Sequence, residues 1–306
     1  MTSLITLRHA AAVIDLAPAT GGAIARFDWC DQPVLRPTPA EVVAEGDVRR
    51  HACYPLVPYS NRIEQARLTF RGTTHQLDRN FGDHPHAIHG VGWQRPWVVV
   101  DHDQDTALLA CEHTPGANDA DGRAWPWPFR TTQWFQLRGD EQQAVLRMRL
   151  TLTNRGEATF PFGLGWHPFF PGGAHTTLGF IATGVWESSD TILPVRHVPV
   201  ADRFQFDPPR AISDMFLDNV YTGWQGEAQL RYPGQARFTT MRGDSACPYF
   251  VVYIPSHGTF LAIEPVSQMT DAFNRAERGE RDTGTRLLGP GESFSCTMEI
   301  STRELA

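Results

Sequence analysis

Apolar and polar residues alternate with a period of two along most of the chain, which is the pattern of a strand with one buried face. Within residues 144–152, leucine and methionine alternate with arginine and threonine, and residues 294–301 repeat the pattern near the end of the sequence. Short turn signals such as Pro233-Gly234 separate several of these runs. Further strands are expected at 65–71, 95–101, 129–138, 227–232, 236–241, 249–254 and 259–263.

Helical periodicity is weak by comparison. Residues 39–50 can form one short helix and 213–217 a single turn, while 26 glycines and 23 prolines leave little room for long helices. Because strands do not alternate with long helices, a doubly wound α/β fold is disfavoured. The pattern predicts a large antiparallel protein of the all-β class.

Two polar stretches, 114–124 and 274–286, interrupt the pattern of alternation. Strand patterning continues on both sides of the first stretch, so we interpret both as long loops and not as linkers between domains. We therefore expect one domain over residues 1–306.

Net charge and cysteine content limit the classes of binding partner, and the cellular compartment, that are expected for the protein. The chain of 306 residues has a formal net charge of −7 and no long basic run, which argues against nucleic acid or an anionic membrane as a partner. No apolar run approaches the ~20 residues of a membrane helix, and no signal peptide is evident. The five cysteines are scattered without a C-x-x-C pair, which indicates buried free thiols and a cytoplasmic protein.

The segment PYSNRI places Asn61 and Arg62 just before an expected strand. A guanidinium in this position can donate paired hydrogen bonds to an oxygen-rich ligand. A surface arginine beside a turn would have the same pattern.

The segment HPHAIHGVGW contains His84, His86, His89 and Trp93. Alternate residues of a strand share a face, so His-x-His can bind a metal ion. A metal centre usually adds a carboxylate, and the nearest following one, Asp101, lies beyond two tryptophans. We therefore favour histidines that hydrogen-bond a sugar or support the fold, and expect neither metal nor cofactor. A metal-dependent β-sandwich or cupin-like enzyme is the alternative.

Three further titratable residues lie in segments that are otherwise apolar. His167 is surrounded by glycine, tryptophan and phenylalanine in PFGLGWHPFF, and it is either a proton donor near neutral pH or a satisfied core histidine. Glu264 ends an apolar run before Pro265. Burial would raise the pKa of this carboxyl toward that of a general base, although a glutamate that caps a strand in solvent would look the same. Asp218, in FLDNVY, is a further candidate.

Tryptophan is abundant, with nine residues in the chain. Indole faces can stack on the C–H faces of a pyranose ring, so one or two of them are expected at a ligand and the rest in the core. Six lie in or near the segments above: Trp93, Trp97, Trp125, Trp127, Trp166 and Trp224.

Taken together and in order, these motifs resemble the aldose 1-epimerase (galactose mutarotase) family over about residues 20–300. The motifs are NRI at 61–63, HG at 89–90, GLGWHPFF at 163–170, LDN at 217–219 and IEP…DAFN at 263–274. The resemblance implies a large antiparallel β-sandwich with a sugar cleft that is open to solvent. It also implies an isomerase that interconverts the anomers of a free aldose by acid and base catalysis.

The resemblance also implies roles for individual residues. Glu264 matches the family's general base and His167 its general acid. Arg62 and His89 match positions that bind sugar oxygens, and Asp218 matches a carboxylate that holds sugar hydroxyls. To this substrate-binding group we add Asn61 and Trp93, which neighbour Arg62 and His89 in the sequence.

The chain departs from the best-known galactose mutarotases at two positions. It has His89-Gly90-Val91 where they have His-Gly-Gly, and Trp166 before His167 where they have asparagine. The chain therefore resembles a divergent bacterial branch, and the identity of the aldose stays open. The alternatives are an anionic sugar, such as a hexose 6-phosphate or sulfoquinovose, and a sugar-binding protein that catalyses nothing. We expect a monomer or a weak homodimer.

Overall fold

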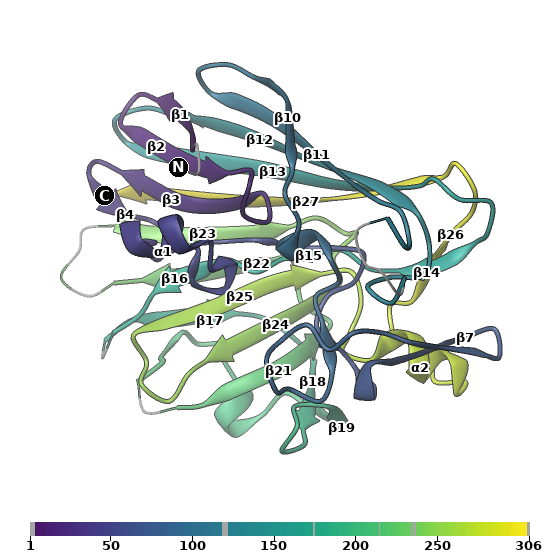
Figure 1. Ribbon diagram of the computed structural model, residues 1–306. Coiled ribbons are helices and arrows are strands. Elements are labelled where there is room, and N and C mark those ends of the chain that lie inside the picture. The colour runs from purple at the N-terminus through teal and green to yellow at the C-terminus, as the bar shows by residue number, and fades with distance from the viewer. Residues whose placement is uncertain are drawn as a thin grey trace.

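The structure is a computed structural model that describes residues 4–117, 122–173, 175–213, 215–232, 234 and 237–304. Two large antiparallel sheets dominate it (Figure 1). The nine-stranded sheet comprises, in spatial order, β10 (Val98–His102), β11 (Thr106–His113), β12 (Phe129–Gly139), β13 (Gln143–Asn154), β27 (Ser293–Glu304), β23 (Arg237–Gly243), β22 (Glu227–Arg231), β17 (Thr177–Phe180) and β20 (Arg210–Ala211).

The eight-stranded sheet positions several residues of the site described below. Its path comprises β19 (Pro194–Pro199), β18 (Gly184–Ser188), β21 (Leu217–Thr222), β24 (Tyr249–Ile254), β25 (Phe260–Val266), β15 (Gly165–Trp166) and β5 (Pro55–Leu56), and β16 (Phe169–Pro171) pairs with β25 beside it. In Figure 1, β11, β12, β13 and β27 cross the upper half of the molecule, above β25, β24 and β21.

Smaller sheets and short helices complete the described fold. One small sheet comprises β1 (Ile5–His9), β2 (Ala12–Ala17), β3 (Ala23–Trp29) and β4 (Gln32–Pro33). Three strand pairs are β6 (Arg62–Ile63) with β9 (Ala87–Ile88), β7 (Arg67–Phe70) with β8 (Thr73–Gln76), and β14 (Phe160–Phe162) with β26 (Arg286–Leu288). The helices are α1 (Ala40–Glu45) and α2 (Ala272–Glu277), with 3₁₀ helices at Val48–Arg50, Glu64–Ala66, Gly92–Gln94 and Asp202–Phe204.

The predicted antiparallel all-β class is confirmed, and the alternation explains why. In β13 the leucines and Met148 are buried, whereas Arg147 and Arg149 are exposed. The apolar face of each large sheet turns toward the other sheet. Phe180 of β17 packs edge-on against Phe250 of β24, with ring centroids 4.9 Å apart, so the core lies between the two sheets.

Several sequence predictions differ from the structure in detail. The helix expected at 39–50 is divided, because Gly46 adopts φ = 72° and ends α1 before the 3₁₀ helix Val48–Arg50. The strand expected at 65–71 is shorter, because Gln65 and Ala66 have positive φ. The single helical turn expected at 213–217 does not form in its described residues: Ser213 is in a turn, β21 begins at Leu217, and position 214 lies outside the described residues.

The structure agrees to different extents with the two loops that the sequence predicts. The stretch 114–124 contains no strand or helix among its described residues, with 118–121 outside the described range. The stretch 274–286 instead begins inside α2, where tertiary hydrogen bonds hold Asn274. Its Oδ1 accepts from the Thr69 N–H at 2.8 Å, and its Nδ2 donates to the Arg67 carbonyl at 2.9 Å. The loop prediction is therefore wrong for 274–277, which are helical, and confirmed for 278–285.

The cysteines and the membrane prediction can also be compared with the structure. All five cysteines are free thiols, but Cys30 is exposed, so the expectation that all are buried is wrong for that residue. No helix in the described part of the chain has the length and apolar character to span a bilayer.

Candidate active site

The register of the eight-stranded sheet brings two carboxylates to one face. Asp218 of β21 is opposite Tyr253 of β24, which is opposite Ala262 of β25. Glu264 is two residues further along β25, so it shares the face of Ala262. Since Phe250 points into the core between the sheets, Tyr253, three residues further along the same strand, faces away from it, together with Asp218 and Glu264.

A short crossing segment brings His167 to the same face. Gly165 of β15 pairs with Val266 of β25 and with Leu56 of β5. The His167 N–H then donates to the Tyr54 carbonyl at 3.0 Å. The backbone around His167 is therefore fixed from both sides by hydrogen bonds.

Glu264 and His167, which are distant in the sequence, meet in the structure. His167 Nε2 lies 3.2 Å from Glu264 Oε1, and the two side chains are 10% and 2% exposed. The other polar atoms, His167 Nδ1 and Glu264 Oε2, are buried without a hydrogen-bond partner among the described residues. Such atoms are costly in a folded protein, and they are common where a ligand is to be bound.

Burial acts in opposite directions on the two members of this pair. It raises the pKa of Glu264 well above 4.5, with a further contribution from the Asp218 charge. Burial, with the Arg36 charge second, lowers the pKa of His167 to about 3. Both shifts disfavour the charged forms, and they therefore favour a state in which the pair holds a single proton between Oε1 and Nε2.

Arg62 and Asp218 form an ion pair in the same region. Arg62 Nη2 lies 3.1 Å from Asp218 Oδ2, while Nη1 donates to Asn61 Oδ1 at 2.9 Å. The Arg62 Nε is buried without a partner among the described residues. Asn61 and Arg62 thus act as a unit, in which the Asn61 side chain orients the guanidinium.

His89 follows β9 and is held by the same asparagine. Its backbone N–H donates to the Asn61 carbonyl at 2.9 Å, and its Nδ1 accepts from the Asn61 N–H at 3.0 Å. Since burial lowers the pKa of His89 well below 6.5, the ring is neutral and its proton is on Nε2. His89 therefore has one free donor, and its ring centroid is 5.4 Å from that of His167.

These side chains line a cavity of about 430 Å³, a volume in the range of small-molecule sites. Phe216, which is 53% exposed, stands at its rim. The described lining residues are Arg36, Arg49, Tyr54, Asn61, Arg62, Phe81, His84, Ile88, His89, His167, Phe169, Ile192, Phe216, Asp218, Tyr253, Phe260 and Glu264.

Of the seven residues that the sequence analysis assigned a catalytic or substrate-binding role, six line this cavity: Asn61, Arg62, His89, His167, Asp218 and Glu264. Trp93 does not line the cavity: it is 1% exposed and its indole N–H donates to the Gly90 carbonyl at 3.0 Å. It packs behind Tyr54, with ring centroids 5.6 Å apart. Among the described lining residues there is no tryptophan, so the expectation that an indole faces the ligand is corrected.

The sequence prediction missed Arg36, Tyr54, Phe169 and the rim residue Phe216. The Arg36 guanidinium lies 3.9 Å from the centroid of the Phe169 ring. Phe169 in turn stacks on His167, with centroids 4.3 Å apart. Phe169 belongs to the GLGWHPFF motif and could have been included, but no local signal marks Arg36.

The alternative of a metal centre on His84, His86 and His89 lacks a donor set. No group of three His, Cys, Asp or Glu side chains within the described ranges is arranged to hold a metal ion. His86 is buried and does not line the cavity, and its Nδ1 accepts a hydrogen bond from the Gln65 N–H at 2.9 Å. His89 Nδ1 accepts a hydrogen bond from the Asn61 N–H.

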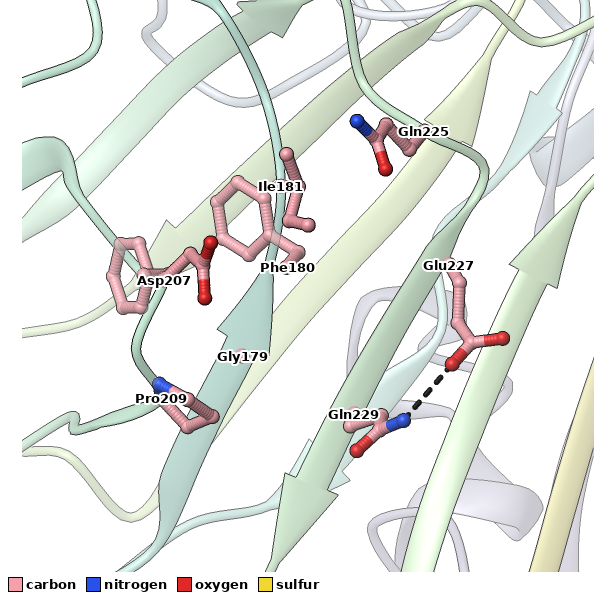
Figure 2. A pocket seen from close by; sticks show the side chains of 9 residues that line it. Gly179, Phe180, Ile181, Asp207, Pro209, Gln225, Glu227 and Gln229 are labelled. Carbon is pink, nitrogen blue, oxygen red and sulfur yellow. Dashed lines mark hydrogen bonds between the residues drawn. The ribbon is translucent and has the colours of Figure 1, made fainter.

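A second cavity, of about 400 Å³, lies between β17, β22 and residues 206–209 (Figure 2). Its Glu227 accepts hydrogen bonds from Gln229 at 2.9 Å and from Arg242 at 2.8 Å. No histidine is among its described lining residues. It therefore offers no counterpart to the proton-sharing pair of the first cavity.

Comparison with known proteins bears on both the fold and the site. The family model described as aldose 1-epimerase matches residues 3–301 of the chain. The uncharacterized protein YphB of Escherichia coli strain K12 is 29% identical over 97% of this chain and 98% of that protein. The solved structure of a putative aldose 1-epimerase from Escherichia coli K12 superposes with a TM-score of 0.86 at 28% identity, covering 99% of each chain.

More distant solved structures share the fold. A galactose mutarotase-like protein from Clostridium acetobutylicum has a TM-score of 0.83 at 16% identity, covering 99% of this chain and 95% of that one. Galactose 1-epimerase from Lactobacillus acidophilus NCFM has a TM-score of 0.77 at 18% identity, again covering 99% and 95%. These likenesses confirm the galactose mutarotase-like fold expected from the sequence.

Proposed function

This chain belongs to the aldose 1-epimerase family, and on that premise we propose that it is a mutarotase, an isomerase that interconverts the α and β anomers of a free aldose. Anomer exchange requires the cyclic hemiacetal to open and close. A base removes the proton of the C1 hydroxyl while an acid protonates the ring oxygen, so the bond between C1 and that oxygen breaks. The aldehyde rotates about its C1–C2 bond, and the reverse steps close the ring.

The pair formed by Glu264 and His167 supports this proposal most directly. The two oxygens that exchange protons are bonded to the same carbon, and an acid and a base that serve both must lie side by side. Glu264 Oε1 and His167 Nε2 are 3.2 Å apart in the wall of the cavity. In our proposal Glu264 is the base and His167 the acid in ring opening.

A single shared proton suits both halves of the cycle. With the closed ring bound, the productive arrangement is carboxylate and imidazolium. After ring opening the proton lies on Glu264 and the imidazole of His167 is neutral. Closure on the opposite face of the aldehyde uses the pair in reverse, with Glu264 as acid and His167 as base. The pair thus returns to its starting state with no net proton uptake.

The remaining polar residues hold the sugar in this proposal. His89 donates from Nε2, and Arg62 contributes the buried Nε that has no protein partner in the described structure. Asp218 accepts from sugar hydroxyls while it balances the charge of Arg62. The aromatic side chains of Tyr253 and Phe216 line the cavity and provide faces for the apolar side of the ring.

The test is replacement of Glu264 by glutamine, which keeps the shape of the side chain and removes the base. Exchange between the anomers of freshly dissolved sugars is followed by polarimetry and by NMR exchange spectroscopy. The variant is expected to lose about 10²–10⁴-fold in the catalysed rate. A matched control is Glu112→Gln, since Glu112 lies on β11 with its side chain 65% exposed, and its rate should equal that of the parent.

Two results would count against the proposal. If Glu264→Gln equilibrates anomers as fast as the parent, the assignment of the base is wrong. If the parent binds sugars saturably without accelerating their exchange, the chain is a non-catalytic sugar-binding protein.

A further inference from the structure

The Arg36 side chain carries a charge with no counter-ion in the described structure. It lines the cavity, and its Nη2 donates only to the carbonyls of His51, at 3.0 Å, and Arg49, at 3.3 Å. No carboxylate of the described residues forms an ion pair with it. Burial lowers the pKa of Arg36 to about 10, so the guanidinium is still protonated at neutral pH.

The other charges around the cavity are balanced locally. Arg62 is paired with Asp218 at 3.1 Å. Arg49 forms a two-pronged pair with Asp47, with distances of 2.9 Å and 3.2 Å. In the proposed mechanism Glu264 and His167 share one proton and are together neutral. The positive charge of Arg36 is therefore the one among these groups that no described neighbour compensates.

The position of Arg36 relates this charge to one end of a bound sugar. The ring of Phe169 contacts both groups: its centroid is 3.9 Å from the guanidinium carbon of Arg36 and 4.3 Å from the centroid of the His167 ring. Phe260 holds the guanidinium from another side, with its ring centroid 4.6 Å away. Arg36 is thus held beside His167 by two aromatic rings, with its Nε and Nη1 not used by any described acceptor.

The proposed role of His167 fixes which part of the sugar comes near. If His167 protonates the ring oxygen, the carbon next to that oxygen lies close to the same wall. In an aldohexose in its pyranose form this carbon is C5, which carries the exocyclic C6. C1, the other neighbour of the ring oxygen, lies at Glu264 in the proposed mechanism, so this pose directs the C6 end toward the wall formed by Phe169 and Arg36.

We propose that the natural substrate is an aldose with an oxyanion at C6, a carboxylate, sulfonate or phosphate, and that Arg36 binds this group. The inference rests on the proposed mutarotase function and specifies its substrate class. A guanidinium fork matches the geometry of an oxyanion, and a hydrogen bond between charged groups is stronger than one to a hydroxyl. Partial burial under Phe169 and Phe260 strengthens the interaction further, because solvent screens it less.

The first experiment uses the unmodified protein and so does not depend on any variant folding. Anomer exchange is measured by NMR for glucose, glucuronate, glucose 6-phosphate and 6-deoxy-6-sulfoglucose. The uncatalysed exchange of each sugar, including catalysis by its own anionic group, is subtracted. We expect kcat/KM for at least one anionic sugar to exceed that for glucose by about 10–100-fold, the value of one charged hydrogen-bonding contact. The three anionic arms identify which oxyanion is preferred.

The second experiment removes the charge. In Arg36→Leu the ratio of kcat/KM for the preferred anionic sugar to that for glucose should fall by about 10–100-fold. Arg36→Lys, which keeps the charge without the fork, should restore part of the ratio. The matched control is Arg50→Leu, which removes a nearby positive charge outside the cavity lining. It should leave the ratio within about twofold of the parent.

The outcomes separate this inference from the proposed function. If glucose is exchanged as efficiently as every anionic sugar, or if Arg36→Leu leaves the ratio unchanged, the inference is wrong while the mutarotase function stands. If none of the four sugars is exchanged faster than its own uncatalysed rate, the proposed function fails and the inference fails with it.

Discussion

Arg62 and Asp218 form a nearly buried ion pair between two segments that are 156 positions apart in the sequence. The nitrogen and oxygen atoms are 3.1 Å apart, and the side chains are 12% and 13% exposed. The pair joins β6 to β21, and so ties the connection that carries Asn61 and His89 to the sheet that carries Glu264. We therefore expect its members to affect stability and, in the proposed function, sugar binding.

Asp218→Asn should destabilise the fold by about 3 kcal/mol, because it leaves the buried Arg62 charge without its counter-ion. Urea denaturation measures this free energy of unfolding. The matched control is Glu112→Gln, which breaks the Arg130–Glu112 pair, where the side chains are 42% and 65% exposed. This control should cost less than ~1 kcal/mol. Equal effects of the two substitutions would show that the Arg62–Asp218 pair is effectively solvated.

The rate of anomer exchange should be flat over a wide range of pH. In the proposed mechanism the pair is active while it holds one proton. Burial lowers the pKa of His167 to about 3 and raises that of Glu264 above its ordinary value. A second proton is added only as the pH falls toward the lowered pKa of His167. The single proton is lost only as the pH rises through the raised pKa of Glu264.

The measurement is kcat/KM for a neutral aldose between about pH 4 and pH 9, with the spontaneous rate subtracted at each point. The acid limb should lie below the ordinary histidine pKa of about 6.5. An acid limb centred at that ordinary value would contradict the prediction, since it would mean that His167 titrates as a solvated imidazole.

Gly90→Ala should be far more damaging than Gly72→Ala. Both glycines have positive φ, 70° and 75°. A Cβ on Gly90 would lie 2.3 Å from the Val57 carbonyl oxygen, whereas nothing lies within 4 Å of one on Gly72. We expect a loss of about 1 kcal/mol for Gly72→Ala, from backbone conformation alone.

For Gly90→Ala the backbone clash adds to the conformational cost, and we expect a loss of at least ~2 kcal/mol. Since Gly90 follows His89 directly, the shift should also reduce the rate of anomer exchange. Chemical denaturation and the exchange assay measure the two effects. Similar stability for the two variants would mean that the chain at Val57 moves aside without cost.

The sequence predicted β13 and β27 well because their burial pattern is local. In β13 and β27 each residue's exposure follows from its parity, and no long-range information is needed. The prediction failed where a tertiary contact overrides local preference. Asn274 in α2 is an example, since its hydrogen bonds to Arg67 and Thr69 stabilise a polar residue inside a helix.

The candidate site could be assembled from the sequence only in part. Glu264 and His167 stand out because a titratable side chain in an apolar run needs a reason. Arg36 does not stand in an apolar run, so the sequence does not single it out. A tertiary hydrogen bond from its backbone N–H to the Phe169 carbonyl, at 2.8 Å, holds this part of the chain beside the cavity. Trp93 was placed wrongly because the Gly90 carbonyl satisfies its indole N–H, which allows full burial.

Glu264 belongs to a strand that has hydrogen-bonded neighbours on both sides, β24 on one and β15 with β16 on the other. Phe216 and Ile192, by contrast, belong to connections between strands at the margin of the cavity. Arg36 also lies in a connection, so in the proposed function the acid–base pair and the groups that choose the sugar belong to separate parts of the architecture. A lineage that altered only those connections would inherit the same ring-opening machinery and could acquire a different sugar.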